Sequence, residues 1–227
     1  KQRLPDGPGG GHMHDDVLER FVQDYIESVT GDEVVFSWQG GEPTLMGLDF
    51  FRRVVALQAR HAKAGQRIEN DLQTNGTLLD EEWAAFLKEH RFLVGLSIDG
   101  PREVHDHFRV TKQAQPTFDT VYAAAQLLRR AGVPFNSLTC VHRFNASRPL
   151  DVYRFLRREL GSTYLQFIPI VEPKDFETVA PQSRDARQLP MVGAPESRPD
   201  HPQSIVTPWS VDPDEYGYFL SKVWDEW

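Results

Sequence analysis

Cysteine is almost absent from this sequence, and long apolar runs are missing altogether. The 227 residues contain a single cysteine, Cys140. No intrachain disulfide can therefore form, and this sequence alone cannot supply a metal site made of several thiolates. No apolar run is long enough to cross a bilayer and no secretory signal pattern opens the sequence, so we expect a cytoplasmic protein without a membrane partner.

Basic residues are also scarce. The 25 Lys and Arg residues are outnumbered by 33 Asp and Glu residues, which gives a net charge of −8 at pH 7. Contacts of Lys and Arg with phosphate dominate nucleic-acid binding, so this balance argues against nucleic acid as the main partner. Hydrophobic residues make up 40% of the sequence and charged residues 26%, which is typical of a globular protein with one large core or two small ones.

Helical and strand patterns alternate along the sequence. Apolar residues at steps of three and four predict helices, and short apolar runs predict buried strands. The predicted helices are 15–29, 48–58, 80–90, 117–132, 149–160 and 212–227, and the predicted strands are 34–38, 68–74, 92–98, 134–141 and 164–170. Such alternation indicates a parallel α/β sheet. A fold of this kind normally begins with a strand, so we expect a first strand to be missing ahead of Lys1.

The predicted organisation has three parts. Residues 1–172 form the core of the fold, the proline-rich residues 173–211 form a long loop or linker, and residues 212–227 form a final helix. In the first helix the apolar residues share one face: Val17, Leu18, Phe21, Val22, Tyr25, Ile26 and Val29. In the last helix we expect the following to pack inward, or to form the seam to a further domain: Tyr216, Phe219, Leu220, Val223, Trp224 and Trp227.

A glycine pair and a carboxylate follow the first predicted strand, where ligand sites of parallel sheets gather. The segment reads Gln39, Gly40, Gly41 and Glu42. Glycines let a backbone approach a ligand, and exposed backbone groups beside a carboxylate suit a primary ammonium group. A tight strand-to-helix turn is the alternative interpretation.

A candidate anion site follows the third predicted strand. Ser97 and Asp99 are two residues apart and point to the same side, and Arg109 can reach back to them as a two-pronged donor. The alternative is a surface salt bridge from Arg109 to Glu103 or Asp106.

Histidine pairs are a weaker signal. His12 with His14, and His105 with His107, have a spacing that metal ligands can use, but no further His or Cys completes either set, so histidines in loops are the favoured interpretation. Cys140 is expected to be a small buried apolar residue, because no His and Asp arrangement around it indicates a nucleophile.

Several motifs, taken in order, resemble those of the radical S-adenosylmethionine enzymes. Within that family the sequence is most similar to the anaerobic sulfatase-maturating enzymes. The motifs are residues 36–45 (FSWQGGEPTL), 72–76 (LQTNG) and 97–101 (SIDGP) continuing through His105-Asp106 to Arg109, with 9–13 and 166–172 also similar.

The resemblance implies a partial (β/α)6 barrel that holds S-adenosylmethionine against a [4Fe-4S] cluster. By matching positions, Gly40, Gly41 and Glu42 would receive the methionine ammonium group, and Ser97 and Arg109 would contact the ribose and the carboxylate. The remaining implied contacts are with the adenine, by Ile168 or Ile170, and with the same cavity, by Gln39, Asn75 and Asp99.

The resemblance also implies an oxidoreductase that converts a Cys or Ser of an unfolded sulfatase to formylglycine, with an electron donor such as flavodoxin or ferredoxin. In that family three cysteines spaced Cys-x3-Cys-x2-Cys bind the cluster, and a cysteine-rich C-terminal domain binds two more clusters. This sequence has neither, so we expect the cluster ligands to lie upstream of Lys1 and these residues alone to be inactive.

Three alternatives remain open at this stage. One is a related radical enzyme that modifies another peptide, because the motifs define the cofactor more than the substrate. Another is a binding or interaction module without a cluster, which the missing cysteines favour. The third and most distant is a barrel hydrolase that uses the histidine pairs.

Overall fold

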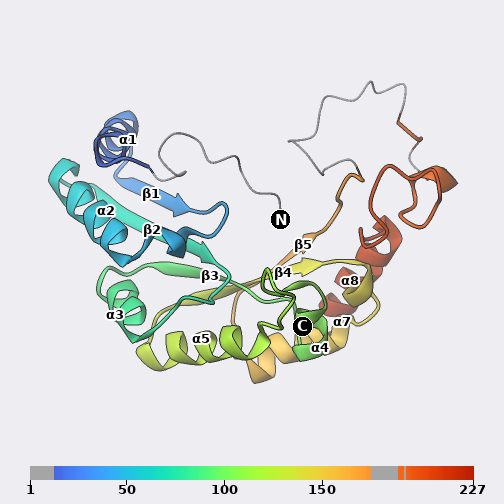
Figure 1. The fold of residues 1–227 in the computed structure, drawn as a ribbon. Coiled ribbons are helices and arrows are strands. Elements are labelled where there is room, and N and C mark those ends of the chain that lie inside the picture. Colours follow the sequence, from blue (N-terminus) through green and yellow to red (C-terminus); the bar gives the residue numbers. More distant parts are fainter. Residues whose placement is uncertain (1–12, 175–188, 192) are drawn as a thin grey trace. The chain divides into compact units, whose positions relative to one another are not determined.

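Five strands form one sheet in the computed structural model, which describes residues 13–174, 189–191 and 193–227. The strands are β1 (Glu33–Trp38), β2 (Arg67–Thr74), β3 (Leu93–Ser97), β4 (Phe135–Val141) and β5 (Leu165–Pro169), and the sheet order is β1-β2-β3-β4-β5. β1 pairs in parallel with β2, and β2 in parallel with β3. Each strand thus neighbours the next strand along the chain, with helices between them (Figure 1), which confirms the predicted α/β class.

The helices occupy most of the predicted positions. They are α1 (Asp15–Ser28), α2 (Leu48–His61), α3 (Glu81–Glu89), α4 (Arg102–Phe108), α5 (Phe118–Ala131), α6 (Arg143–Ala146), α7 (Pro149–Arg154) and α8 (Pro213–Glu226), with 3-10 turns η1 (Pro43–Met46) and η4 (Pro195–Ser197). The helix predicted over 149–160 ends as a π-helical turn, η2 (Phe155–Glu159). Two short helices, α4 and α6, were not predicted. Among the described residues no helix is long and apolar enough to cross a membrane.

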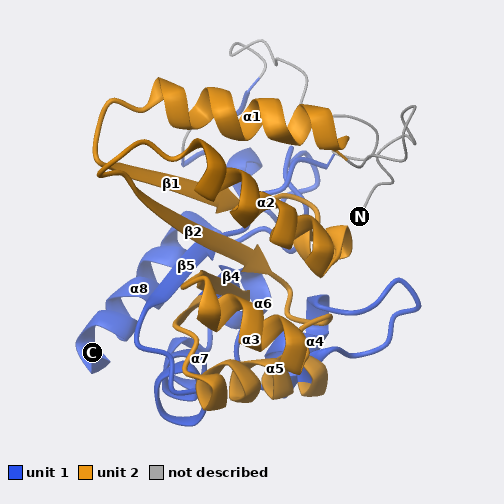
Figure 2. Cartoon of the chain, turned by 90° about the vertical axis from the view of Figure 1, so that its left-hand side faces the viewer, with its two compact units in different colours: residues 1–2, 98–118, 138–227 blue, residues 3–97, 119–137 orange. Residues whose placement is uncertain are grey.

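The chain divides into two compact units (Figure 2). Unit 2 contains residues up to Ser97 together with Asp119–Ser137, and unit 1 contains Ile98–Phe118 and Leu138–Trp227. The predicted boundary at residue 172 differs from this division and stays a prediction.

Aromatic side chains fill the core of unit 2. Phe51 is fully buried and lies edge-on to Trp38, Phe50 and Trp83, with ring centroids 5.2–5.7 Å apart. These rings come from β1, α2 and α3, so burial of large apolar area fixes both helices near the strand. β1 itself alternates, with Val34 buried and its neighbours exposed, so the prediction of a strand buried on both faces is wrong for β1.

Unit 1 has an aliphatic and aromatic core of its own. Val104, Val152 and Leu156 are fully buried, and they come from α4, α7 and η2. Phe219 of α8 lies edge-on to Phe167 of β5 at 5.1 Å. The last helix is therefore part of this unit's core.

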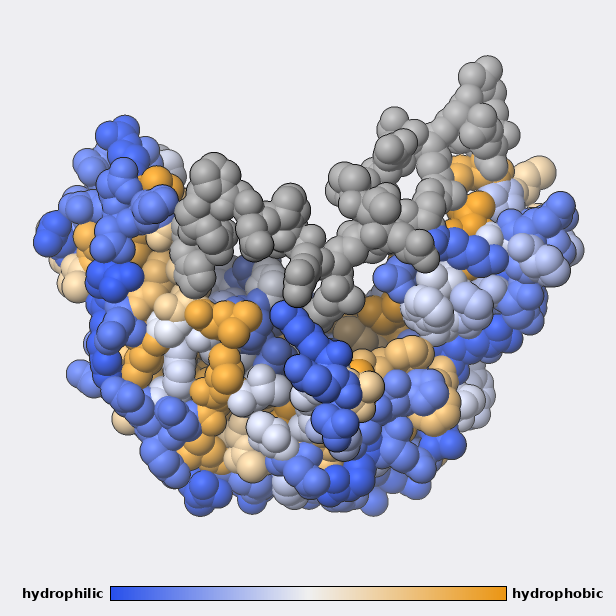
Figure 3. Space-filling view, in the orientation of Figure 1, coloured by the Kyte–Doolittle hydropathy of each residue, from blue (hydrophilic) through white to orange (hydrophobic). Residues whose placement is uncertain are grey.

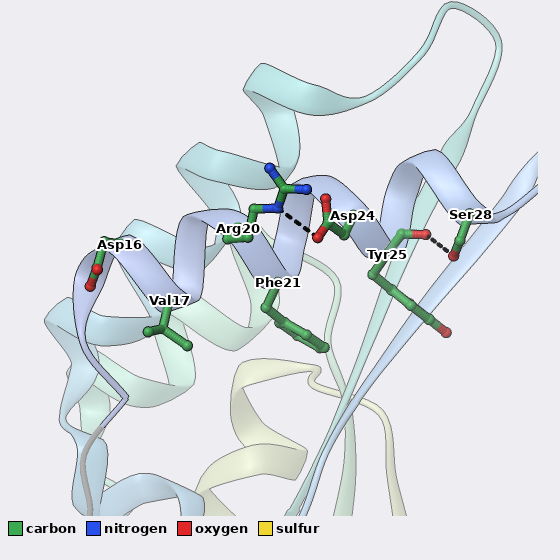
Figure 4. Close-up of a pocket in the computed structure, with 7 residues that line it drawn as sticks. All are labelled: Asp16, Val17, Arg20, Phe21, Asp24, Tyr25 and Ser28. Atoms are coloured by element: carbon green, nitrogen blue, oxygen red, sulfur yellow. Dashed lines mark hydrogen bonds and ion pairs between the residues drawn. The ribbon is translucent and has the colours of Figure 1, made fainter.

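The apolar face of α1 is only half covered. Leu18, Val22 and Ile26 are fully buried, whereas Val17 and Phe21 are 51% and 42% exposed. A groove of about 670 Å³ runs along α1. Its lining residues all belong to this helix, and Figure 4 shows their side chains. In Figure 3 the outer surface over α1 and α2 is mostly hydrophilic, with smaller hydrophobic areas beside it.

The prediction for the last helix is partly wrong. Phe219 and Val223 pack inward, but Leu220 is 39% exposed, Trp224 74% and Trp227 82%. The helix buries one narrow stripe and leaves its tryptophans on the surface.

The proline-rich segment is partly described. Pro173 forms an isolated antiparallel bridge with Val206, and Lys174 N donates to Ile205 O at 2.8 Å. Apart from η4 the described part of 189–211 contains turns and irregular backbone. Residues 175–188 and 192 lie outside the described residues.

Candidate functional site

The glycine pair after β1 has an unusual backbone. The φ angles of Gly40 and Gly41 are 99° and 34°, in the region that side chains with a Cβ rarely adopt. A Cβ added at either position would meet no atom within 4 Å, so glycine is required for conformation and not for lack of room. Both glycines and the preceding Gln39 are exposed, which leaves this backbone open to a ligand.

Glu42 is held in place by four hydrogen bonds within unit 2. Its Oε1 accepts from Thr44 Oγ1 at 2.6 Å, Thr44 N at 3.2 Å and Thr74 Oγ1 at 2.7 Å. Its Oε2 accepts from Asn75 N at 2.7 Å. The carboxylate thereby joins the loop after β1 to the end of β2, and Thr44 and Thr74 are both buried.

The charge of Glu42 is not neutralised inside the described part of the chain. All four donors are neutral hydroxyl or backbone groups, and none of the described Lys, Arg or His side chains forms an ion pair with it. A carboxylate offers about four acceptor positions, and Oε2 uses only one of its own. The residue is therefore an oriented anion with spare acceptor capacity, which suits an ammonium group.

Two other predicted residues of unit 2 end neighbouring strands. The Asn75 side chain is half-buried, and its Oδ1 accepts from Thr77 N at 2.9 Å and Thr77 Oγ1 at 2.7 Å. Ser97 is only 8% exposed, and its hydroxyl forms no hydrogen bond with the described part of the chain. A hydroxyl without such a partner is available to a ligand.

The predicted anion site in unit 1 is a buried ion pair. Arg109 Nε donates to Asp99 Oδ2 at 2.7 Å, and Arg109 Nη2 donates to Asp99 Oδ1 at 3.0 Å. The Asp99 side chain is 3% exposed and that of Arg109 24%. Two shielded charge-assisted bonds contribute about 1.5–3 kcal/mol each. Arg109 Nη1 forms no hydrogen bond with the described residues.

The alternative interpretation of Arg109 as a surface ion pair is wrong. Glu103 pairs with Arg148 instead. Asp106 accepts from the backbone N–H groups of Thr117 and Phe118 at 2.9 and 2.8 Å, and so caps the start of α5. Neither carboxylate contacts Arg109.

Cys140 at the end of β4 contacts the same ion pair. Its backbone N donates to Asp99 Oδ1 at 2.8 Å, and its Sγ accepts from Arg109 Nη2 at 3.4 Å. Burial, together with the Asp99 carboxylate, raises the pKa of the thiol and keeps it protonated. Cys140 is half-buried and accepts a hydrogen bond, so the prediction of a small buried apolar residue is partly wrong. That it is not a nucleophile stays a prediction.

His105 contacts the ion pair from α4. The side chain is fully buried, with Asp99 N donating to its Nδ1 at 3.4 Å and its Nε2 lying 3.1 Å from Thr117 Oγ1. Burial lowers its pKa to about 4. Asn145, also fully buried, supports the neighbouring backbone, because its Nδ2 donates to Cys140 O at 3.0 Å and Asp99 O at 3.4 Å.

The two histidine pairs lie in different parts of the chain, and only one of them is fully described. His105 and His107 lie on α4 and not in a loop, and they face different surroundings, because the His107 ring stacks on Phe144 at 4.0 Å. His14 precedes α1 and His12 lies outside the described residues. In the described ranges no three His, Cys, Asp or Glu side chains gather as a metal site. With one cysteine in the sequence, these residues also do not fit an iron-sulfur cluster held by three thiolates.

A second histidine is buried close to His107. His142 is 2% exposed, neither ring nitrogen has a hydrogen-bond partner in the described structure, and burial lowers its pKa to about 4. A groove of about 420 Å³ adjoins this cluster, lined by His107, Phe108, Arg143, Phe144, Pro208 and Trp209.

The two predicted adenine contacts flank the end of β5. Ile168 and Ile170 are both half-buried. Ile170 N donates to Val141 O at 2.8 Å, and Val211 N donates to Ile170 O at 2.9 Å. Their apolar side chains are partly open, and packing against a ligand stays a prediction.

Sequence reasoning missed the residues that hold the predicted ones. Thr44 and Thr74 orient Glu42, and Thr117 and Asn145 orient the Asp99 region. Of the residues that support the predicted ones, only His105 could have been selected from the sequence, because it lies in the His-Asp segment between Asp99 and Arg109.

Comparison with known proteins decides the family. The model of the radical SAM superfamily matches residues 4–156. The chain belongs to the radical SAM superfamily.

The most informative relatives are maturation enzymes. A serine-type anaerobic sulfatase-maturating enzyme of Bacteroides thetaiotaomicron is 40% identical over 215 residues, covering 95% of this chain and 49% of the relative. A cysteine-type enzyme of Clostridium perfringens is 44% identical over 164 residues, covering 72% of this chain and 44% of the relative. The chain thus spans about half the length of the curated relatives it matches.

Solved structures agree with the sequence relatives. Native anSMEcpe with bound AdoMet and Cp18Cys peptide has a TM-score of 0.77 at 35% identity, covering 96% of this chain and 53% of that one. Streptococcus suis SuiB has a TM-score of 0.55 at 13% identity, covers 75% of this chain and 37% of that one, and so shares the fold alone. The suspected family resemblance is confirmed.

Proposed function

We propose that this chain binds S-adenosylmethionine and serves an enzyme that converts a Cys or Ser of a sulfatase to formylglycine. The observation that carries the proposal is Glu42, an oriented carboxylate with four neutral donors and no cation among the described residues. The superfamily membership and the maturating relatives support it. The relatives include both serine-type and cysteine-type enzymes, so the target residue stays open.

The residues of unit 2 fit the methionine end of this cofactor. Glu42 would pair with the ammonium group, and the exposed backbone of Gly40 and Gly41 would add hydrogen bonds to it. Ser97, whose hydroxyl has no hydrogen-bond partner among the described residues, would contact the ribose. Gln39 and Asn75 remain predicted neighbours of the same ligand.

The residues of unit 1 keep their predicted roles. Arg109 would use its Nη1, which has no hydrogen-bond partner among the described residues, on the cofactor carboxylate, while Asp99 holds the rest of the guanidinium. Asp99 would therefore act through Arg109. Ile168 or Ile170 would supply apolar contact with the adenine.

When bound and reduced by one electron, S-adenosylmethionine would supply the chemistry of hydrogen abstraction from a substrate. This chain's own residues would bind and orient the cofactor by the ammonium and carboxylate groups of its methionine part and shield it from water. An unfolded sulfatase segment as substrate, an electron donor such as flavodoxin or ferredoxin, and a cytoplasmic location are further parts of the proposal. A peptide bound to anSMEcpe supports the first of these.

Calorimetry of S-adenosylmethionine binding tests the proposal. Glu42→Gln keeps the shape of the side chain and removes its charge, so affinity should fall about tenfold. Glu89→Gln on the exposed end of α3 is the matched control and should bind as the native protein does. Absence of binding by the native protein would overturn the proposal.

A second assay separates the enzyme from a binding module. The full-length protein, including the cluster cysteines expected upstream of Lys1, is purified anaerobically, reconstituted with iron and incubated with S-adenosylmethionine and sulfatase peptides that carry Cys or Ser. Deoxyadenosine together with the mass change of formylglycine supports the maturase. Deoxyadenosine with a mass change only in other peptides favours a related radical enzyme, and binding with neither product favours the binding module.

A further inference from the structure

His105 connects the backbones of the two residues that form the buried ion pair. Asp99 N donates to its Nδ1 at 3.4 Å, and Nε2 lies 3.1 Å from Thr117 Oγ1. Thr117 Oγ1 in turn donates to Arg109 O at 2.6 Å. The imidazole thus reaches Asp99 directly and Arg109 through one hydroxyl.

The donor directions fix the state of the ring. A backbone N–H can only donate, so Nδ1 is the acceptor and carries no proton. The Thr117 hydroxyl donates a hydrogen bond to the Arg109 carbonyl, so its oxygen accepts one from Nε2–H of His105. The hydrogen bonds that run from Asp99 N through His105 and Thr117 to Arg109 O are all satisfied only when the imidazole is neutral and carries its proton on Nε2.

The surroundings favour that neutral form. His105 is fully buried on α4, and the charged groups that face it are Asp99 and Asp106, which oppose Arg109. A second ring proton on Nδ1 would point at Asp99 N–H, placing two donors against each other. Burial outweighs the two carboxylates and keeps the ring uncharged.

The arrangement closes a loop around Arg109. Its side chain is tied to the Asp99 carboxylate, and its backbone is tied through Thr117 and His105 to the Asp99 backbone. Arg109 N also donates to His105 O at 2.9 Å. An arginine side chain has many rotamers. Fixing the Arg109 backbone and part of its guanidinium therefore pre-organises Nη1, which has no hydrogen-bond partner among the described residues.

We propose that His105 is a positioning residue, which aims Arg109 at the carboxylate of S-adenosylmethionine by holding the backbone at both ends of the Asp99–Arg109 pair. The inference rests on the proposed function, because it assumes that Arg109 meets that carboxylate. A purely structural histidine would affect all ligands alike, whereas this role affects only ligands that carry the carboxylate.

The test compares S-adenosylmethionine with decarboxylated S-adenosylmethionine, which has the same sulfonium and adenosine but no carboxylate. Calorimetry on the native protein should show a preference of about tenfold for the carboxylated ligand. His105→Phe keeps a ring and removes both hydrogen bonds, so most of this preference should vanish while affinity for the decarboxylated ligand stays within about twofold. His105→Gln, which can restore the bond toward Thr117, should recover part of it.

Two further variants keep the result interpretable. Thr117→Val removes only the hydroxyl relay and should reduce the preference even if His105→Phe does not fold. His107→Phe on the same helix, two residues away, retains the stack on Phe144 and should keep the full preference.

The outcomes separate the inference from the proposed function. Equal loss of affinity for both ligands in His105→Phe and Thr117→Val, or an unchanged preference, overturns the positioning role. A native protein that binds both ligands equally also overturns it, while leaving cofactor binding intact. A native protein that binds neither overturns the proposed function itself.

Discussion

Asp99 holds Arg109 by two hydrogen bonds, from Nε at 2.7 Å and from Nη2 at 3.0 Å. The pair joins the end of β3 to the end of α4, ten residues apart in the sequence. Burial opposes the charge on Arg109, but Asp99 more than offsets this, so the pKa of Arg109 is raised.

Removing the charge of Asp99 should cost stability. Asp99→Asn leaves the largely buried guanidinium with one neutral acceptor, so we expect the free energy of unfolding to fall by about 2–4 kcal/mol. Urea denaturation measures this. Glu103→Gln breaks the exposed pair with Arg148 and should cost less than about 1 kcal/mol. Equal losses in the two variants would show that burial does not strengthen the Asp99 pair.

The protein should become less stable as the pH is lowered, because two of its buried histidines have lowered pKa values. His105 and His142 have folded-state pKa values of about 4, against an ordinary value of 6.5, so the unfolded chain binds more protons between these limits. Their contribution is fully present above pH 6.5 and is lost as the pH falls toward 4. Each histidine can lower the free energy of unfolding by up to about 1.4 kcal/mol per pH unit.

Urea midpoints between about pH 8 and pH 5 check this dependence. The charged groups that face His105 are Asp99, Arg109 and Asp106. His14→Gln, at an exposed position before α1, should leave the change of the urea midpoint with pH unaltered. A midpoint that does not move below pH 6.5 in the native protein would contradict the expected depression of both pKa values.

Local patterns in the sequence predicted the strand and helix order, because helical and strand periods are properties of neighbouring residues. α4 was not predicted because it has only seven residues, of which only Val104 and His105 are buried, so it shows no apolar periodicity. The exposure of Trp224 and Trp227 also escaped. Periodicity shows which residues share a face, but the neighbouring elements decide how much of that face is covered.

The candidate site shows the same limit. The glycine pair, Glu42 and Arg109 could be selected from residue type and from their place after strands. The hydrogen bond from Thr74 to Glu42 spans 32 residues and depends on how the ends of β1 and β2 lie beside each other. Patterns of neighbouring residues do not predict such a long-range contact. Likewise, the choice of Asp99 over Asp106 as the partner of Arg109 depends on the path of α4, which was not predicted.

Removing the Thr74 hydroxyl should loosen Glu42. Thr74→Val keeps the shape of a fully buried side chain, but deletes the bond to Glu42 Oε1 and the bond that Thr74 Oγ1 accepts from Gly76 N at 3.0 Å. We expect a loss of about 1–3 kcal/mol in the free energy of unfolding. Thr120→Val on the exposed face of α5 is the control, with an expected change within about 0.5 kcal/mol.

Calorimetry extends this prediction to the ligand. Affinity for S-adenosylmethionine should fall several-fold in Thr74→Val, since a less ordered Glu42 pairs less well with the ammonium group. Unchanged affinity beside a clear loss of stability would mean that Thr74 supports the fold and does not orient Glu42.

Two glycines after strands should respond differently to alanine. Gly40 has a φ of 99° and open space around the added Cβ, so Gly40→Ala should cost about 1 kcal/mol from backbone strain alone. Gly76 has a φ of 75°, and its added Cβ would lie 2.6 Å from Leu96 Cδ1, so Gly76→Ala should cost about 2–4 kcal/mol. Urea denaturation of both variants gives the comparison, and a larger cost at Gly40 would contradict it.

His142→Phe should stabilise the protein. The imidazole is buried with two ring nitrogens that lack partners in the described structure, and its ring lies 4.5 Å from Phe108 and 6.3 Å from Phe144. Phenylalanine fills similar space without polar atoms, so we expect a gain of about 1 kcal/mol at neutral pH and a larger gain near pH 5, where the native imidazole begins to oppose folding. Thermal unfolding at both pH values measures the gain. A loss of stability at both would mean that the His142 nitrogens have a partner, such as an ordered water, that phenylalanine displaces.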